Sequence, residues 1–128
     1  MQLNKFMKTY AEEVNGNFSE YDPSRSVIVI PLANDRFQAV VAAMDANEQI
    51  ITLSSKVCIA DEKIKFKDLL EQNHATTYGK FVIDNGFLKI ESKHKISETS
   101  NDTFKTILQE IANLADTWEM NLTGMDIF

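Results

Sequence analysis

The chain has 128 residues and a formal net charge of −6 at pH 7, with 44% hydrophobic and 25% charged residues. This composition is typical of one globular domain over residues 1–128, and no apolar run is long enough to cross a membrane. The acidic balance disfavours nucleic acid as a partner, because binding to phosphates requires a surplus of Lys and Arg on one face.

The N-terminal sequence predicts a helix and shows no secretory signal. From Leu3 to Val14 the apolar residues recur at helical spacing, which indicates an amphipathic helix. Lys5 and Lys8 are not followed by the apolar segment of about 7–15 residues that a signal peptide needs. Cys58 is the only cysteine, which agrees with a reducing compartment. We therefore expect a cytoplasmic protein.

The next part of the chain predicts consecutive strands joined by short turns. Residues 18–21 are compatible with a short strand, and residues 27–30, 36–44 and 49–59 have the composition and alternation of strands. Three or four such strands in succession imply an antiparallel meander. Residues 36–44 and 49–59 carry apolar side chains on both faces, and helices can cover only one face. The remainder must contact another subunit, contact a partner or stay exposed, although scattered exposed Val and Ala are ordinary on a sheet.

A second helix and a hairpin follow the meander. Helical spacing of apolar residues within residues 61–73 predicts the helix. Asn85 and Gly86, between two apolar runs, predict a type I′ turn with both residues at positive φ. This turn sets Asp84 opposite Phe87 and fixes the register of the two strands. One face of the hairpin then holds the residues expected to be buried: Phe81, Ile83, Leu88 and Ile90.

The last element is the most strongly patterned in the chain. Apolar residues from Phe104 to Leu122 form one helical stripe, and Gly124 suits the residue after the last turn. We expect Leu114 and Trp118, in this stripe, to lie in the main core. The predicted fold is therefore α+β, with three helices and an antiparallel sheet of five or six strands in the order α-β-β-β(-β)-α-β-β-α.

No motif indicates catalysis, a cofactor or a metal site. His74 and His94 are the only histidines, and neither has a second ligand at a metal-binding spacing. Cys58 has no nearby basic cluster to lower its pKa, which favours a structural role. The glycines are scattered singly, so no phosphate-binding loop is present. Several carboxylates lie beside predicted turns, but nothing selects a catalytic pair.

Three segments carry a family resemblance. Residues 69–73 read Leu-Leu-Glu-Gln-Asn, residues 78–84 read Tyr-Gly-Lys-Phe-Val-Ile-Asp, and residues 111–118 read Ile-Ala-Asn-Leu-Ala-Asp-Thr-Trp. With the order of elements, they resemble the type III secretion chaperone fold of Tir-chaperone-like and YbjN-like proteins. In these families a helix ending in Leu-Leu-x-x-Asn precedes a Gly-x-Phe-x-Ile-Asp type of strand, and the last helix often reads like Leu-Ala-Asp-x-Trp. The patterns are loose and mostly record packing.

The resemblance implies a non-enzymatic protein that forms a homodimer and binds an extended segment of another protein. It places the dimer interface at the second helix and the hairpin, with Phe66, Leu69 and Leu70 as candidates. Apolar residues of the first helix and the meander are the candidates for contact with the partner: Phe6, Tyr10, Val40 and Met44. For each of these residues, burial in the core is the competing interpretation. The alternative functions are a regulator without a client, and a small ligand-binding domain or enzyme with a pocket between helix and sheet.

Overall fold

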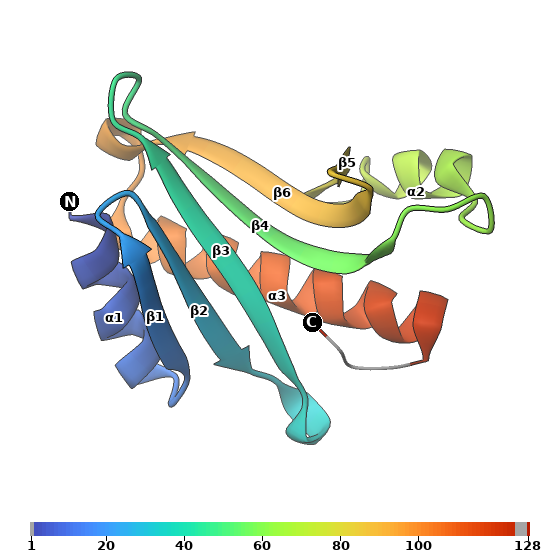
Figure 1. The fold of residues 1–128 in the computed structure, drawn as a ribbon, viewed down its shortest axis with the longest axis horizontal. Coiled ribbons are helices and arrows are strands. Elements are labelled where there is room, and N and C mark those ends of the chain that lie inside the picture. Colours follow the sequence, from blue (N-terminus) through green and yellow to red (C-terminus); the bar gives the residue numbers. More distant parts are fainter. Residues whose placement is uncertain (1, 125–127) are drawn as a thin grey trace.

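An antiparallel sheet with two long helices behind one face forms the frame of the molecule (Figure 1). The structure is a computed structural model that describes residues 2–124 and 128. Within these residues the order is α-β-β-β-β-α-β-β-α, as predicted, with short 3-10 turns η1 and η2 between some elements. The elements are α1 (Leu3–Glu13), β1 (Asn17–Asp22), β2 (Arg25–Pro31), η1 (Ala33–Asp35), β3 (Phe37–Asp45), β4 (Ile50–Ile59), α2 (Phe66–Gln72), β5 (Lys80–Asp84), β6 (Phe87–Lys95), η2 (Ile96–Glu98) and α3 (Asn101–Thr123).

The six strands of the described sheet lie in the order β1-β2-β3-β4-β6-β5, and every pair is antiparallel. β1 to β4 form the predicted meander, because short turns join each strand to the next. β6 then pairs with β4, and β5 lies outside β6. β1 and β5 are therefore the two edges of the sheet.

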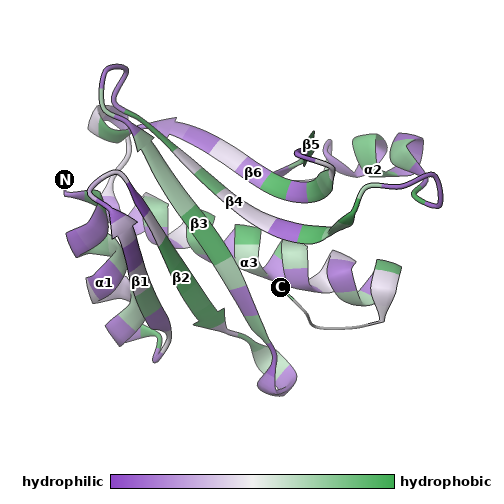
Figure 2. Cartoon of the chain, viewed as in Figure 1, coloured by the Kyte–Doolittle hydropathy of each residue, from purple (hydrophilic) through white to green (hydrophobic). Residues whose placement is uncertain are grey.

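Helices α1 and α3 cover one face, and the pattern of burial along the strands follows from this. In β3, for example, Gln38, Val40 and Ala42 are buried against the helices, whereas the residues between them face the open side. α1 packs against β1 and β2, and α3 packs against β3, β4 and β6. Figure 2 shows apolar residues along most of β2 and β3, and hydrophilic residues interspersed along β4 and β6.

The two ends of α3 have the capping groups that a stable helix needs. Ser100 is the N-cap residue, and its hydroxyl accepts a hydrogen bond from the backbone N–H of Thr103 at 3.1 Å. Gly124 follows the last turn with φ 71°, as the sequence predicted. Leu114 and Trp118 are partly buried and pack against the core, so they lie at its border. Trp118 meets the ring of Phe81 edge-on, with 5.4 Å between ring centroids.

The hairpin register is confirmed along its whole length. Asp84 pairs with Phe87, and Lys80 pairs with Glu91, with the three pairs between them in the expected order. Asn85 and Gly86 have φ values of 51° and 79°, as a type I′ turn requires. The expected burial of Ile83 is wrong: its side chain is 58% exposed. It is the last apolar residue of β5 before the turn, one position from the pair of Asp84 with Phe87.

The second helix is shorter than predicted. α2 begins at Phe66, and residues 61–65 form a turn before it. The Asp61 carboxylate accepts a hydrogen bond from Lys63 N at 3.0 Å, and Asp61 O accepts one from Ile64 N at 3.2 Å. These local hydrogen bonds compete with helix formation, because a carboxylate can satisfy backbone donors two residues later.

β3 and β4 separate at one end of their pairing. The backbone ladder between them runs only from Val41 opposite Ser54 to Asp45 opposite Ile50. Beyond it, side chains bridge the strands: Gln38 Nε2 donates to Lys56 O at 2.9 Å, and Ser55 Oγ donates to Ala39 O at 2.6 Å. We call this place the β3–β4 gap.

Candidate functional site

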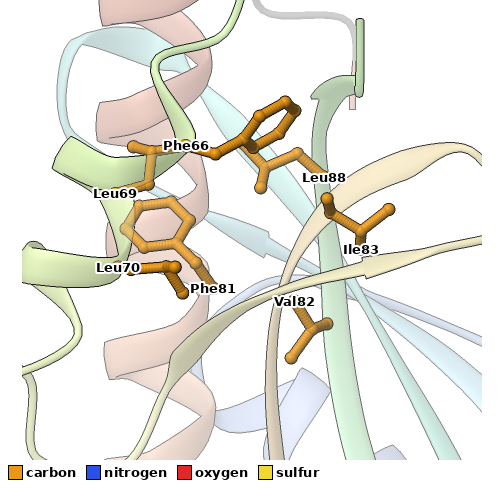
Figure 3. Close-up of a pocket in the computed structure, with 7 residues that line it drawn as sticks. All are labelled: Phe66, Leu69, Leu70, Phe81, Val82, Ile83 and Leu88. Atoms are coloured by element: carbon orange, nitrogen blue, oxygen red, sulfur yellow. The ribbon is translucent and has the colours of Figure 1, made fainter.

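An apolar groove lies between α2 and the β5–β6 hairpin (Figure 3). It encloses about 240 Å³. Its seven lining residues are all hydrophobic: Phe66, Leu69, Leu70, Phe81, Val82, Ile83 and Leu88. These seven side chains offer neither a nucleophile nor a titratable group, so the groove is suited to binding an apolar surface and not to chemistry.

The groove combines residues fixed in the core with residues open to solvent. Leu69 is buried and anchors α2, whereas Leu70, the next residue along the helix, is 65% exposed. Across the groove, Leu88 is buried, and the exposed Ile83 is its partner in the hairpin register. Two large apolar side chains therefore project from a rigid base, which is typical of an interaction surface.

Hydrogen bonds hold α2 against the start of β5 and so fix the width of the groove. The Asn73 side chain, which follows α2, accepts a hydrogen bond from Phe81 N at 2.6 Å. Lys80 Nζ donates to Asn73 O at 2.8 Å and to Thr76 O at 2.7 Å. The ammonium group thus joins the carbonyl of the C-cap residue of α2 to a carbonyl of the loop that follows it. The groove is preformed by these contacts.

Contacts with α3 also hold the two residues before β5, Tyr78 and Gly79, in place. Glu110 Oε1 accepts hydrogen bonds from Tyr78 N at 2.9 Å and Gly79 N at 3.0 Å. A Cβ atom on Gly79 would lie 2.7 Å from Ile90 Cγ2 and 3.3 Å from Leu114 Cδ1. Only glycine lets the chain pass this close to the core before β5 begins.

A second hollow covers the open face of the sheet. It encloses about 670 Å³, and small side chains of the central strands, including Val41, Ala43, Thr52 and Ser54, form its floor. Longer side chains of both charges surround the floor, among them Arg25, Lys89, Asp84 and Glu91. No helix covers this face among the described residues (Figure 1). The apolar surplus that the sequence predicted on β3 and β4 lies here.

The four residues predicted to contact a partner do not form one surface. Val40 has no exposed surface and Tyr10 is buried, so both are core residues in this conformation. Tyr10 is also fixed by its hydroxyl, which accepts a hydrogen bond from Gln109 Nε2 at 2.7 Å. Phe6 and Met44 are partly buried and pack against the core. Phe6 keeps some access to solvent, because it lines a shallow hollow beside α1.

The three residues predicted for a dimer interface are brought together. Phe66, Leu69 and Leu70 form the α2 wall of the groove. The hairpin was predicted to share this interface, but Val82 and Ile83, which belong to the opposite wall, were not singled out. A signal for them was present in the apolar character of the strand, because an apolar edge strand needs a cover, and in the described residues no strand pairs with the outer side of β5.

Burial shifts the pKa values of Cys58 and His94, two of the titratable residues considered for catalysis. Burial is the main cause that raises the pKa of the Cys58 thiol, and the charges of Asp61 and Glu119 add to it. Burial lowers the pKa of His94, whose ring contacts the Ser92 hydroxyl and lies edge-on to Tyr78. Within residues 2–124 and 128, no group of three or more His, Cys, Asp or Glu residues is placed to hold a metal ion.

Comparison with known proteins identifies the fold. No protein-family model and no curated protein sequence matches the chain. A chain in the crystal structure of the ExsC–ExsE complex is similar, with a TM-score of 0.66 and 16% sequence identity. The alignment covers 94% of this chain and 92% of that chain. ExsC is a type III secretion chaperone, so this protein has a type III secretion chaperone-like fold, as the resemblance implied. In the described part of the chain, no helix has the length and apolar character to span a membrane.

Proposed function

We propose that this protein is a non-enzymatic, cytoplasmic binding protein that holds an extended segment of a partner protein. The observation that carries the proposal is the fold, which is similar over 94% of the chain to that of a protein solved in a two-protein complex. The character of the surfaces supports it, because the preformed groove is apolar and the open sheet face is wide and shallow.

We propose further that the protein is a homodimer and that the groove between α2 and the hairpin is the dimer interface. A two-fold axis places the same patch of both subunits in contact, so the patch must be complementary to itself. The groove provides both parts of such a contact, because it has an apolar depression and, at its sides, the projecting Leu70 and Ile83. β5 lies beside it as an edge strand that a second copy can cover.

If a second copy of the chain occupies the groove, the partner segment must bind to the other surfaces of the protein. We propose that it contacts the outer side of α1 near Phe6, the end of β3 near Met44, and the open face of the sheet. An extended segment can also add to a free strand edge by backbone hydrogen bonds, and β1 offers such an edge. Tyr10 and Val40 support this surface from the core, where they are buried.

The alternative function, a small ligand site or enzyme between helix and sheet, has one location to consider. A hollow of about 290 Å³ at the end of α3 is lined by Cys58, Ile59, Asp61, Lys63, Ile64, Glu119, Leu122, Thr123 and Phe128. The raised pKa of Cys58 keeps its thiol protonated and poorly nucleophilic. This property opposes the enzyme and favours the binding protein.

The test is affinity capture of the tagged protein from its native cell, followed by mass spectrometry and by co-expression with each recovered protein. We expect a partner that forms a stable complex on co-expression and protects a continuous segment of itself from proteolysis. Recovery of no such protein, together with a defined small molecule in the hollow at the end of α3, would replace the proposal by the alternative.

A further inference from the structure

Phe128 lies in the β3–β4 gap and is bound by both of its backbone polar groups. Its backbone oxygen accepts a hydrogen bond from Ala39 N, on β3, at 2.9 Å. Its N–H donates to Glu119 Oε2, on α3, at 3.1 Å. Its ring meets that of Phe87, on β6, edge-on with 6.0 Å between centroids. The Lys56 ammonium, on β4, lies 5.7 Å from the centroid of the Phe128 ring.

The groups that hold Phe128 belong to the framework of the fold. Ala39 is available because β3 has left β4 at this point, so its N–H has no partner in the ladder between β3 and β4. Glu119 is fully buried in α3, below the sheet. The Lys56 ammonium lies 4.1 Å from the centroid of the Phe87 ring and is positioned by that contact independently of Phe128. A backbone donor from Ala39, a carboxylate acceptor from Glu119 and an aromatic wall therefore converge on one residue.

We propose that the β3–β4 gap is a binding site for one aromatic residue of the partner's extended segment, and that Phe128 occupies this site within the chain as a competing ligand. The inference rests on the proposed function, because it specifies the chemistry of the partner. Any extended segment presents an N–H and a C=O group like those of Phe128. The aromatic preference comes from the Phe87 ring and the Lys56 ammonium, which both interact favourably with a π face.

Occupancy by Phe128 sets the affinity that a partner needs. A ligand tethered to its own site has an effective concentration on the order of millimolar. A partner segment must therefore bind strongly enough to displace Phe128. Contacts along the rest of the open sheet face can supply the additional affinity. Short peptides with the aromatic residue alone are expected to bind the parent protein poorly.

The experiment uses the full chain with Phe128→Ala, and the probe is the blocked peptide acetyl-Met-Asp-Ile-Phe-amide, which copies residues 125–128. Removal of the ring weakens the internal competitor and leaves the gap available. Titration followed by the amide signal of Ala39 in NMR spectra should give an affinity at least about tenfold higher for F128A than for the parent. A peptide with Ala in place of Phe should not bind.

The matched control is Tyr21→Ala, which removes an exposed aromatic ring from β1 and should bind the probe as the parent does. If F128A does not fold, Phe128→Leu keeps apolar volume without a π face, and it too should bind the probe more tightly than the parent. Equal affinity of the folded variant and the parent, or equal binding of the Ala peptide, would overturn the proposal. The synthetic probe makes this result independent of whether a cellular partner is recovered, so failure of this site and failure of the proposed function can be distinguished.

Discussion

Arg36 and Asp116 form a bidentate ion pair across 80 residues of sequence, between the loop before β3 and the middle of α3. Arg36 Nε lies 3.0 Å from both carboxylate oxygens, and Nη2 lies 2.8 Å from Oδ2. The carboxylate is buried, whereas the guanidinium is partly exposed. The pair attaches the start of β3 to the helix that covers it.

Removal of the guanidinium should therefore destabilise the protein strongly. Arg36→Ala leaves the Asp116 carboxylate buried without this ion pair, and we expect the free energy of unfolding to fall by about 3 kcal/mol. Urea denaturation of the variant and the parent measures the difference. Lys105→Ala, which removes an exposed pair with Glu13, is the control and should cost less than about 1 kcal/mol. Similar losses for the two variants would mean that the Arg36–Asp116 pair contributes no more to stability than an exposed ion pair does.

Gly86→Val tests the hairpin turn. Valine at positive φ is strained, so we expect a loss of about 1–2 kcal/mol or more in the free energy of unfolding. No described atom lies within 4 Å of the position that a Cβ would take, so the cost comes from the backbone and not from a clash. Thermal melts provide the measurement. Gly86→Asn, which tolerates positive φ better, should lie between the parent and the valine variant.

The proposed dimer predicts a change of mass on substitution in the groove. Leu70→Asp places a charge in the proposed interface, and sedimentation at micromolar concentration should give a mass near 14.5 kDa instead of about twice that value. Tyr21→Asp is the control, because Tyr21 is as exposed as Leu70, at 69% against 65%, but lies on the opposite edge strand. A parent protein that already sediments near 14.5 kDa would exclude the dimer.

The lowered pKa of His94 predicts that the protein loses stability in mild acid. Burial among the Tyr78 and Phe104 rings lowers its pKa below the ordinary value of 6.5, so the unfolded chain binds the proton more readily than the folded chain. The contribution of His94 is therefore present above about pH 6.5 and is lost as the pH falls through this value toward the folded pKa. Urea denaturation at several pH values from about 5 to 7.5 should show it.

The matched variant for this experiment is His94→Gln, which keeps a hydrogen-bonding group beside Ser92 but does not titrate. Its stability should change less with pH in this interval than that of the parent. Parallel curves for the parent and the variant would mean that His94 is protonated equally well in the folded and unfolded states.

Cys58 should react slowly with thiol reagents. Burial and the neighbouring carboxylates raise its pKa, so little thiolate is present near neutral pH. Labelling with iodoacetamide at about pH 8, followed by mass spectrometry, should be much slower for the folded protein than for the same chain in urea. Rapid modification of the folded chain would show that the end of β4 opens readily or that the thiol is activated.

Local patterns predicted the hairpin and α3 because each is specified by neighbouring residues. The Asn85–Gly86 pair fixes a register through its own backbone requirement, and the stripe on α3 needs only its spacing. The two faces of β3 could not be told apart in this way, since both are apolar and a strand carries no mark of which face meets the helices. For this reason Val40 was a candidate for contact with the partner, with burial in the core as the competing interpretation. The burial of Tyr10 could have been predicted from the sequence, because the apolar stripe of an amphipathic helix normally faces the core.

The groove and the β3–β4 gap show the limit of sequence reasoning. The α2 wall was predicted from Leu69 and Leu70, but the exposure of Ile83 depends on how the helices pack against the hairpin, which the strand pattern does not contain. The gap depends on two side chains, Gln38 and Ser55, that replace backbone pairing between strands. A contact of this kind joins residues distant in sequence and leaves no period or motif.

The sheet consists of two pieces, β1 to β4 and the β5–β6 hairpin, which are joined by the pairing of β4 with β6. β1 to β4 close by short turns, and β5 and β6 close by another, so each piece forms from contacts near in sequence. Their strands pair where residues 50–59 lie opposite residues 87–95, and Ala60 N donates to Gly86 O at the end of this pairing. The rate at which amide protons between β4 and β6 exchange with solvent should report separation of the two pieces. The exchange rate of the β5 amides should also report fraying of that edge strand. The proposed dimer interface thus lies on the piece that can detach, and association of two chains would slow exchange there most.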